Sequence, residues 1–131
     1  MYSRATPEAK ILDAKAATGI GTPQQIQDFR HLVLALHTSG SANFTVKIQG
    51  SISEDMPDFS AAQSVSNQWD YVQIKDLQNG SSIGGDTGVA AAGTDDHRLF
   101  EVNTNGLRWL CAEITAYAAG EVTLYVKPFR A

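Results

Sequence analysis

Apolar and polar residues alternate along two neighbouring stretches of this chain, which is the pattern of a β-strand with one buried face. In residues 29–38 three leucines share one face, and Gly40 then breaks the run. In residues 43–53 the positions expected to point inward are Phe44, Val46, Ile48 and Ile52. Because the connection over residues 38–42 is short and contains the glycine, the two stretches predict an antiparallel hairpin.

The C-terminal third predicts three further strands separated by short turns. The expected strands cover residues 98–103, 107–117 and 121–129. The first two are expected to pair across Asn105-Gly106, a dipeptide that suits a type I′ turn. Residues 107–117 are apolar on both faces, so this strand should be central or have its second face covered. Strands at near-regular spacing indicate a sandwich or a barrel.

The segments between these strands are less regular. Residues 54–68 are expected to form a long connection, and residues 69–77 a further strand. Residues 80–97 are rich in glycine and small residues, with Ile83 and Val89 as their sizeable apolar side chains. A stretch of this length without regular structure is usually functional or mobile in a compact domain.

The N-terminal region allows two interpretations. Thr6 and Pro7 could begin an alanine-rich helix that ends at Gly19. The alternative is an extended strand over residues 11–17. Propensity alone does not separate helix from strand over residues 7–17, because tertiary contacts override it.

The length of the chain limits it to one domain. Its 131 residues, 43% of them hydrophobic, are enough for one ordinary core and too few for two. We therefore expect residues 1–10 to form an N-terminal arm and residues 11–131 to form a single domain. That domain should be all-β, an antiparallel β-sandwich.

The surface is weakly charged. Only 18% of the residues are charged, the net charge is −4, and the ten basic residues are scattered singly, so no nucleic-acid partner is expected. The longest apolar run, residues 32–36, is strand-sized, so no membrane partner is expected either. No signal peptide is visible, and the single Cys111 excludes an internal disulfide. We expect a protein made and used without secretion machinery.

Two acidic motifs are candidates for chemistry. Asp86-Thr87-Gly88 matches the core tripeptide of aspartic proteases, but glycines and small residues stand where that chemistry needs a flanking apolar strand. Asp86, Asp95, Asp96 and His97 could contribute to a cation site, but adjacent acids lack the alternate spacing of calcium ligands. We expect a Gly-rich loop at the first motif and solvated or turn-capping residues at the second.

Other candidates also have plainer explanations. His31 and His37 would lie about 20 Å apart along a strand, too far to share a metal. Cys111 is expected to be a small buried hydrophobic residue and not a nucleophile. A sugar-binding face could be lined by Trp69, Tyr71, Trp109, Tyr117 and Tyr125, but aromatic residues in strands usually belong to the core. We therefore expect no catalysis, no cofactor and no metal.

Several blocks of this sequence resemble small virion structural proteins of tailed bacteriophages, from about residue 18 to the end. The blocks are 41–47 (SANFTVK), 57–59 (PDF), 67–71 (NQWDY), 107–110 (LRWL) and 114–124 (ITAYAAGEVTL). The last is the most suggestive, because an aromatic strand, a small-Gly turn and a Val-Thr strand recur in phage jelly-roll modules.

The resemblance implies a jelly-roll-like component of the virion, synthesised in the cytoplasm of the bacterial host. It implies most directly a decoration protein that binds the major capsid protein, as a homo-oligomer and commonly a trimer, and reinforces the head shell. A tail, baseplate or fibre component that binds another virion protein is the alternative, and a carbohydrate-binding module is the second alternative. Contacts are expected from Tyr2, Arg4 and Pro7 in the arm and from Ile83, Asp86, Val89, Asp95 and His97 in the Gly-rich segment.

Overall fold

The computed structural model of this chain describes residues 9–27, 29, 31–94, 97–104 and 106–129. Nearly all of the regular structure in these residues is β-strand. The elements are β1 (Ala9–Lys15), β2 (Gly19–Ile20), β3 (Gln24–Gln25), β4 (His31–Ser51), α1 (Gln63–Ser66), β5 (Asp70–Tyr71), β6 (Ile74–Asp76), β7 (Ser82–Ile83), β8 (Val89–Thr94), β9 (His97–Asn103) and β10 (Trp109–Phe129).

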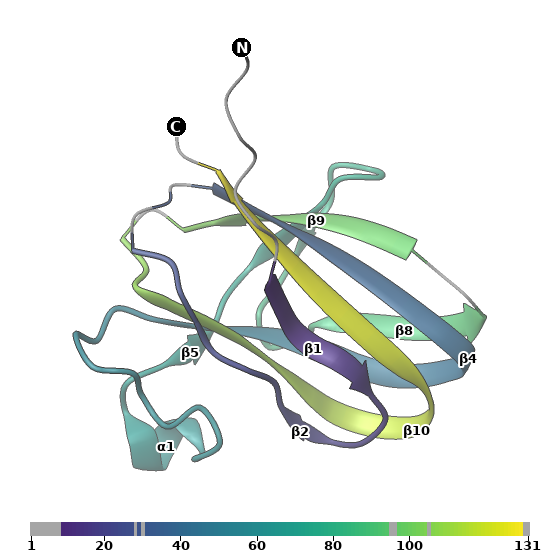
Figure 1. The fold of residues 1–131 in the computed structure, drawn as a ribbon, viewed down its shortest axis with the longest axis horizontal. Coiled ribbons are helices and arrows are strands. Elements are labelled where there is room, and N and C mark those ends of the chain that lie inside the picture. Colours follow the sequence, from purple (N-terminus) through teal and green to yellow (C-terminus); the bar gives the residue numbers. More distant parts are fainter. Residues whose placement is uncertain (1–8, 28, 30, 95–96, 105, 130–131) are drawn as a thin grey trace.

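Two strands of 21 residues, β4 and β10, pair antiparallel along their whole length. Ser51 lies opposite Trp109 at one end of this ladder, and His31 lies opposite Phe129 at the other. Both strands fold over halfway, at the right of Figure 1. On the other side of β4, β9 follows its first half and β8 its second half. The paired strands β4 and β10 therefore turn together at one end of the molecule, with β8 and β9 each beside one half of β4.

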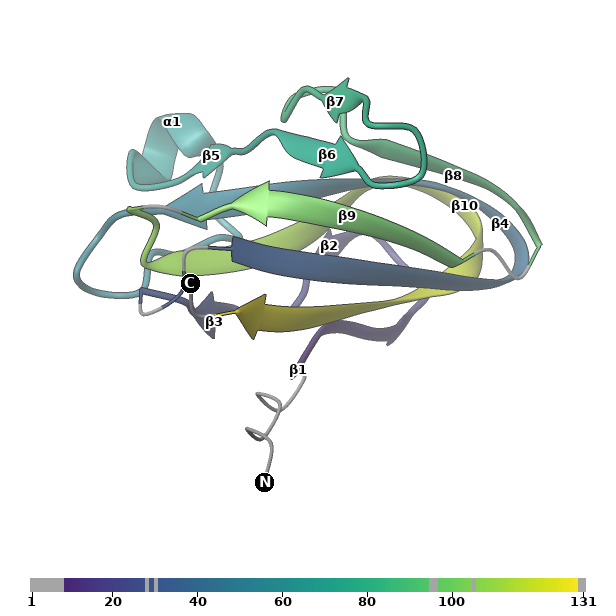
Figure 2. The same cartoon turned by 90° about the horizontal axis from the view of Figure 1, so that it is seen from above.

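This fold-over divides the strands into two layers. One layer has the order β1-β10-β4-β9-β6-β7, and Figure 2 shows β10, β4, β9 and β6 side by side. The other layer uses the remaining halves of β4 and β10, with β2 and β3 beside β10 and with β5 and β8 beside β4. The pairings are antiparallel, which confirms the expected all-β, sandwich-like fold.

The alternation seen in the sequence sets which face of β4 is buried. The inward side chains of both halves are buried in one continuous core, as predicted: Leu32, Leu34, Leu36, Phe44, Val46 and Ile48. They meet the inward side chains of β10, β9 and β1. Ile52 was expected on the same face but is 71% exposed, because β4 ends at Ser51 and the chain turns away.

The hairpin predicted across residues 38–42 is wrong, and so is the short turn predicted between residues 117 and 121. Both segments are bends within continuous strands, at Gly40 (φ 74°) and Gly120 (φ 89°). A Cβ at Gly120 would lie 2.7 Å from the Cα of Ala42, so the two backbones come too close for any side chain there. Glycine and small residues serve here to bend two paired strands together, and register shifts in the ladder take up the difference in path length.

Two further predictions need correction. Residues 98–103 do not pair with residues 107–117, because β4 lies between β9 and β10. The Gly-rich segment 80–97 is not structureless, since it contains β7 and β8. Val89 and Ala91 of β8 are buried, so a sequence of small residues still contributes to the core.

The remaining segments agree more closely with expectation. Residues 54–68 form a long connection whose regular structure is the four-residue α1. The strand predicted over residues 69–77 is split into β5 and β6. In the described part of the chain, no helix is long and apolar enough to cross a membrane.

The N-terminal region is extended. Over residues 7–17 the described part is 9–17, of which β1 occupies Ala9–Lys15, so the strand interpretation is confirmed. Ile11 and Leu12 are buried where β1 pairs with β10, and this tertiary pairing overrides the helix propensity of an alanine-rich sequence. β1 begins at Ala9, inside the segment 1–10 expected as an arm, and the rest of that segment lies outside the described residues.

Candidate interaction surface

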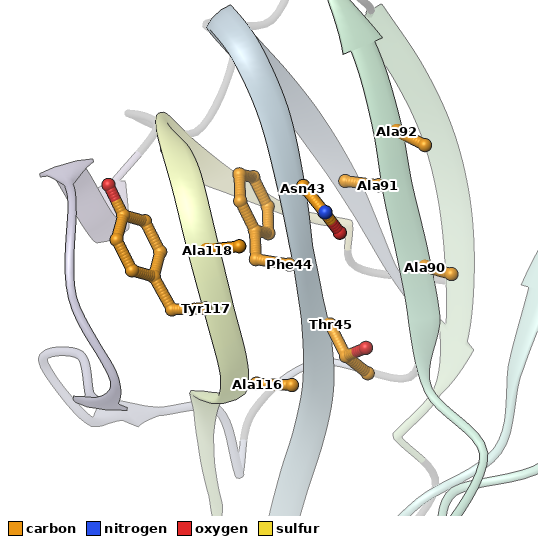
Figure 3. A pocket seen from close by; sticks show the side chains of 9 residues that line it. All are labelled: Asn43, Phe44, Thr45, Ala90, Ala91, Ala92, Ala116, Tyr117 and Ala118. Carbon is orange, nitrogen blue, oxygen red and sulfur yellow. The ribbon is translucent and has the colours of Figure 1, made fainter.

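The fold-over brings three strands side by side at the end of the molecule, and their outward faces form a small-residue surface over β8, β4 and β10 (Figure 3). We call this the bend surface. It contains an open hollow of about 230 Å³, whose exposed or half-buried lining residues are Asn43, Thr45, Ala90, Ala92, Ala116, Tyr117 and Ala118. The core residues Phe44 and Ala91 lie at its floor. The lining residues include no Asp, Glu, Lys, Arg or His. The bend surface therefore suits close contact with another protein's backbone better than recognition of a charged ligand.

Aromatic rings support the bend surface from one side. The ring of Phe44 stacks on the ring of Tyr117, with 6.4 Å between ring centres. The Tyr117 hydroxyl donates a hydrogen bond of 2.8 Å to the carbonyl of Gly120, at the bend itself. These contacts hold β10 in its folded-over path, so the bend surface is part of the rigid framework.

A polar cluster lies on the outward face of the second layer. The Tyr71 hydroxyl donates a 2.5 Å hydrogen bond to Glu113, and the Lys47 ammonium lies 4.8 Å from the centre of the Tyr71 ring. Burial raises the pKa of Tyr71, and the hydrogen bond and charge of Glu113 and the charge of Asp86 raise it further. The phenol therefore stays protonated and acts as a donor that ties β5 to β10.

The connection between β4 and β5 covers the rest of this face. Gln49 donates from its side chain to the carbonyl of Phe59 at 3.0 Å, and the Phe59 and Trp69 rings pack 6.2 Å apart. Beneath them, Cys111 lies opposite Gln49 on β10 and is fully buried. Burial raises the pKa of its thiol to about 11. Both sequence predictions are confirmed: the second face of β10 is covered, and Cys111 is a buried hydrophobic residue.

The same packing takes up Trp69 and Tyr71, two of the aromatic residues considered for a sugar-binding face. Trp69 is 8% exposed, and its indole nitrogen donates to the carbonyl of Ala61 at 3.1 Å. Tyr71 meets the edge of the Trp69 ring, 5.0 Å between centres, and carries Lys47 over its own ring. Trp69 is therefore buried, and the Tyr71 ring is engaged by Trp69 and Lys47, so neither residue is an open platform for a sugar ring.

The residues expected at contacts differ in their location and exposure in the structure. Asp86 is exposed in a tight turn in which the backbone N–H groups of Thr87 and Gly88 both donate to the carbonyl of Gly84 at 3.1 Å. Ile83 is half-buried opposite Ile74, in β7.

Val89 and His97 differ from each other in exposure. Val89 is 7% exposed and points into the core, so its side chain does not lie on the surface. His97 is exposed and its ring centre lies 6.0 Å from that of His37 on β4. Four of the expected residues fall outside the described part of the chain: Tyr2, Arg4, Pro7 and Asp95.

The bend surface itself was not identified from the sequence. Its signal was the alternation of exposed alanines, at Ala90 and Ala92 and again at Ala116 and Ala118. The sequence does not show that these alanines share one surface, because it does not show that β8, β4 and β10 lie side by side. Among the described residues, no group of three or more His, Cys, Asp or Glu side chains is arranged to hold a metal.

Comparison with known proteins finds a likeness in fold. No protein-family model matches the sequence, and no curated protein matches it. The crystal structure of SPBc2 prophage-derived protein YomS is similar, with a TM-score of 0.64 and 14% sequence identity. The likeness covers 96% of this chain and 95% of that one. This chain therefore shares its fold, over nearly its whole length, with that protein.

Proposed function

We propose that this chain is a structural protein of a bacteriophage particle, made in the cytoplasm of the bacterial host and assembled into the virion. The observation that carries the proposal is the likeness in fold, over 96% of the chain, to a protein that derives from a prophage. The sequence blocks that resemble phage virion proteins, above all residues 114–124, support it from a different direction.

In this role the protein binds and does not catalyse. The bend surface supports this, because its small uncharged side chains allow a partner's backbone to approach closely and leave few polar groups to be desolvated. The low content of charged residues, 18%, fits a protein packed against neighbours.

Within the particle, we propose that the chain decorates the head: it binds the major capsid protein and stabilises the shell. A single domain of 131 residues is of a suitable size for an added outer component. The trimer implied by the sequence resemblance remains a prediction. It is tested by measuring the mass of the purified protein and its copy number on the particle.

The experiment is to mix the purified protein with capsids of the encoding phage that lack it. We expect saturable binding at a fixed ratio to the capsid protein, and decorated capsids should withstand more heat or chelation before they open. Ala116→Arg, which places a long charged side chain on the bend surface, should weaken binding about tenfold or more.

Thr18→Arg is the matched control, since Thr18 is exposed in the turn between β1 and β2, outside the bend surface. Wild-type binding by this variant is the expected result. If the wild-type protein does not bind capsids and labelled antibodies find it on the tail, head decoration is excluded and a tail component takes its place. If intact particles contain no copy of the protein, the structural role itself is wrong.

A further inference from the structure

β8 is an edge strand of its layer. One side of the strand pairs with β4 over residues 41–46. In the described part of the chain, no strand or loop backbone pairs with its other side. In an antiparallel edge strand, the N–H and C=O groups of every second residue point outward, so β8 offers unused backbone groups to a further strand.

The other long edges are closed. The edge of β9 is covered by β6, and the N–H of Leu77 donates to the carbonyl of Leu99 at 3.1 Å. β1 carries two register shifts, a residue at positive φ, Ala14, and an exposed ion pair of Lys10 with Asp13. Bulges and charges of this kind prevent edge-to-edge pairing. β8 has neither a charged residue nor a proline over Val89–Thr94, and its ladder with β4 has no register shift. Gly93, near the end of the strand, has a positive φ of 123°, so the regular part of the edge is residues 89–92.

β8 is also held firmly in place. Val89 and Ala91 are anchored in the core. At the start of the strand, a Cβ on Gly88 would lie 2.7 Å from both the carbonyl oxygen of Val46 and the side chain of Lys47, so the chain lies flush against β4 there. A rigid edge pays little conformational entropy when a partner strand pairs with it.

We propose that β8 pairs antiparallel with β8 of a second copy of this chain, across a two-fold axis. The composition of β8 indicates that its partner is a second copy of this strand. The strand has no charged side chain, so pairing with itself places no like charges opposite one another within the ladder, and its exposed side chains at Ala90 and Ala92 are small enough for close approach.

The pairing sets the oligomeric state. A two-fold contact makes a dimer, in contrast to the trimer implied by the sequence resemblance.

Single introduced cysteines test the contact with purified protein alone, so the result is independent of any capsid. Ala90→Cys and Ala92→Cys, each treated with a short bis-maleimide linker, should give covalent dimers in high yield. Ala16→Cys, exposed in the turn after β1 at the other edge of the sheet, is the matched control and should give few. The native Cys111 does not interfere, because it is fully buried.

Light scattering over a range of concentrations gives the second readout. The wild-type protein should be a dimer, and Ala92→Lys should weaken the dimer about tenfold or more, since charged edge residues oppose strand pairing. Amide exchange needs no variant: the outward amides of β8 should gain protection as concentration rises. A protein that stays monomeric while these amides exchange freely would overturn the proposal, as would a trimer in which Ala90→Cys and Ala92→Cys do not cross-link.

Discussion

Gly120 is the residue at which the bend is most tightly constrained. Its φ of 89° is unfavourable for any residue with a Cβ, and that Cβ would also lie 2.7 Å from Ala42 and 3.0 Å from the carbonyl oxygen of Ser39. We expect Gly120→Ala to lower the free energy of unfolding by about 3 kcal/mol or more, from backbone strain and overpacking together. Urea unfolding measures the change.

Gly80→Ala separates the two causes. Gly80 also has a positive φ, 77°, but nothing lies within 4 Å of the position its Cβ would take. This variant should lose only about 1–2 kcal/mol, the cost of the backbone conformation. Equal losses in the two variants would show that the contact between the strands at the bend does not constrain Gly120.

Cys111 makes stability depend on pH in the alkaline range. Burial raises the pKa of its thiol from the usual value near 9 to about 11 in the folded protein. Below about pH 9 the thiol is neutral in both states and its contribution is constant. Between about pH 9 and pH 11 only the unfolded chain ionises, so the folded state should lose roughly 2–3 kcal/mol.

Cys111→Ala provides the comparison, because the other titrating groups are common to both proteins. The stability difference between wild type and variant should shrink as the pH rises through this range, when both are unfolded in urea. A difference that stays constant from neutral pH to about pH 11 would show that burial does not hold the thiol neutral.

Among the elements, the connection between β4 and β5 acts as a lid on the outward face of the second layer. Trp69 packs on Phe59, which in turn is bound by Gln49 directly above Cys111. Trp69→Ala should therefore cost about 3–5 kcal/mol and make Cys111 reactive toward a thiol reagent under native conditions. Val65→Ala is the control in the same connection, because Val65 is 74% exposed, and it should change neither quantity.

The elements also show where sequence reasoning succeeds and fails. Alternation placed Leu32 and Phe44 in the core correctly, because a period of two is a local property of one strand. It failed for Gln49, which alternates outward yet is buried, since the covering lid is brought there by tertiary structure. The glycines at the bend were misread as turns, because a bend in two paired strands and a hairpin turn use the same residue types.

The bend surface also depends on tertiary structure and not on the local sequence pattern. Ala90 and Ala116 lie far apart in the sequence, and only the pairing of β4 with both β8 and β10 brings them together. The candidate contacts predicted from the sequence came instead from one continuous segment, and the structure places Val89 of that segment in the core.

For the whole molecule, the main consequence of the topology is that the two layers share their central strands. β4 and β10 each contribute one half to either layer, so one layer cannot separate without breaking the ladder that holds the other. We therefore expect a single cooperative unfolding transition, although the core lies between two layers and the lid adds a third set of contacts.

This prediction can be measured with probes that lie in different places. In a Trp109→Phe background the fluorescence comes from Trp69 and reports on the lid, and far-ultraviolet circular dichroism reports on the strands as a whole. The two denaturation curves should coincide. Gly120→Ala should shift both curves equally, since the bend joins the layers. If tryptophan fluorescence changes at lower urea than the dichroism, the lid unfolds as a separate unit. If the dichroism itself shows two steps, the long strands do not couple the layers.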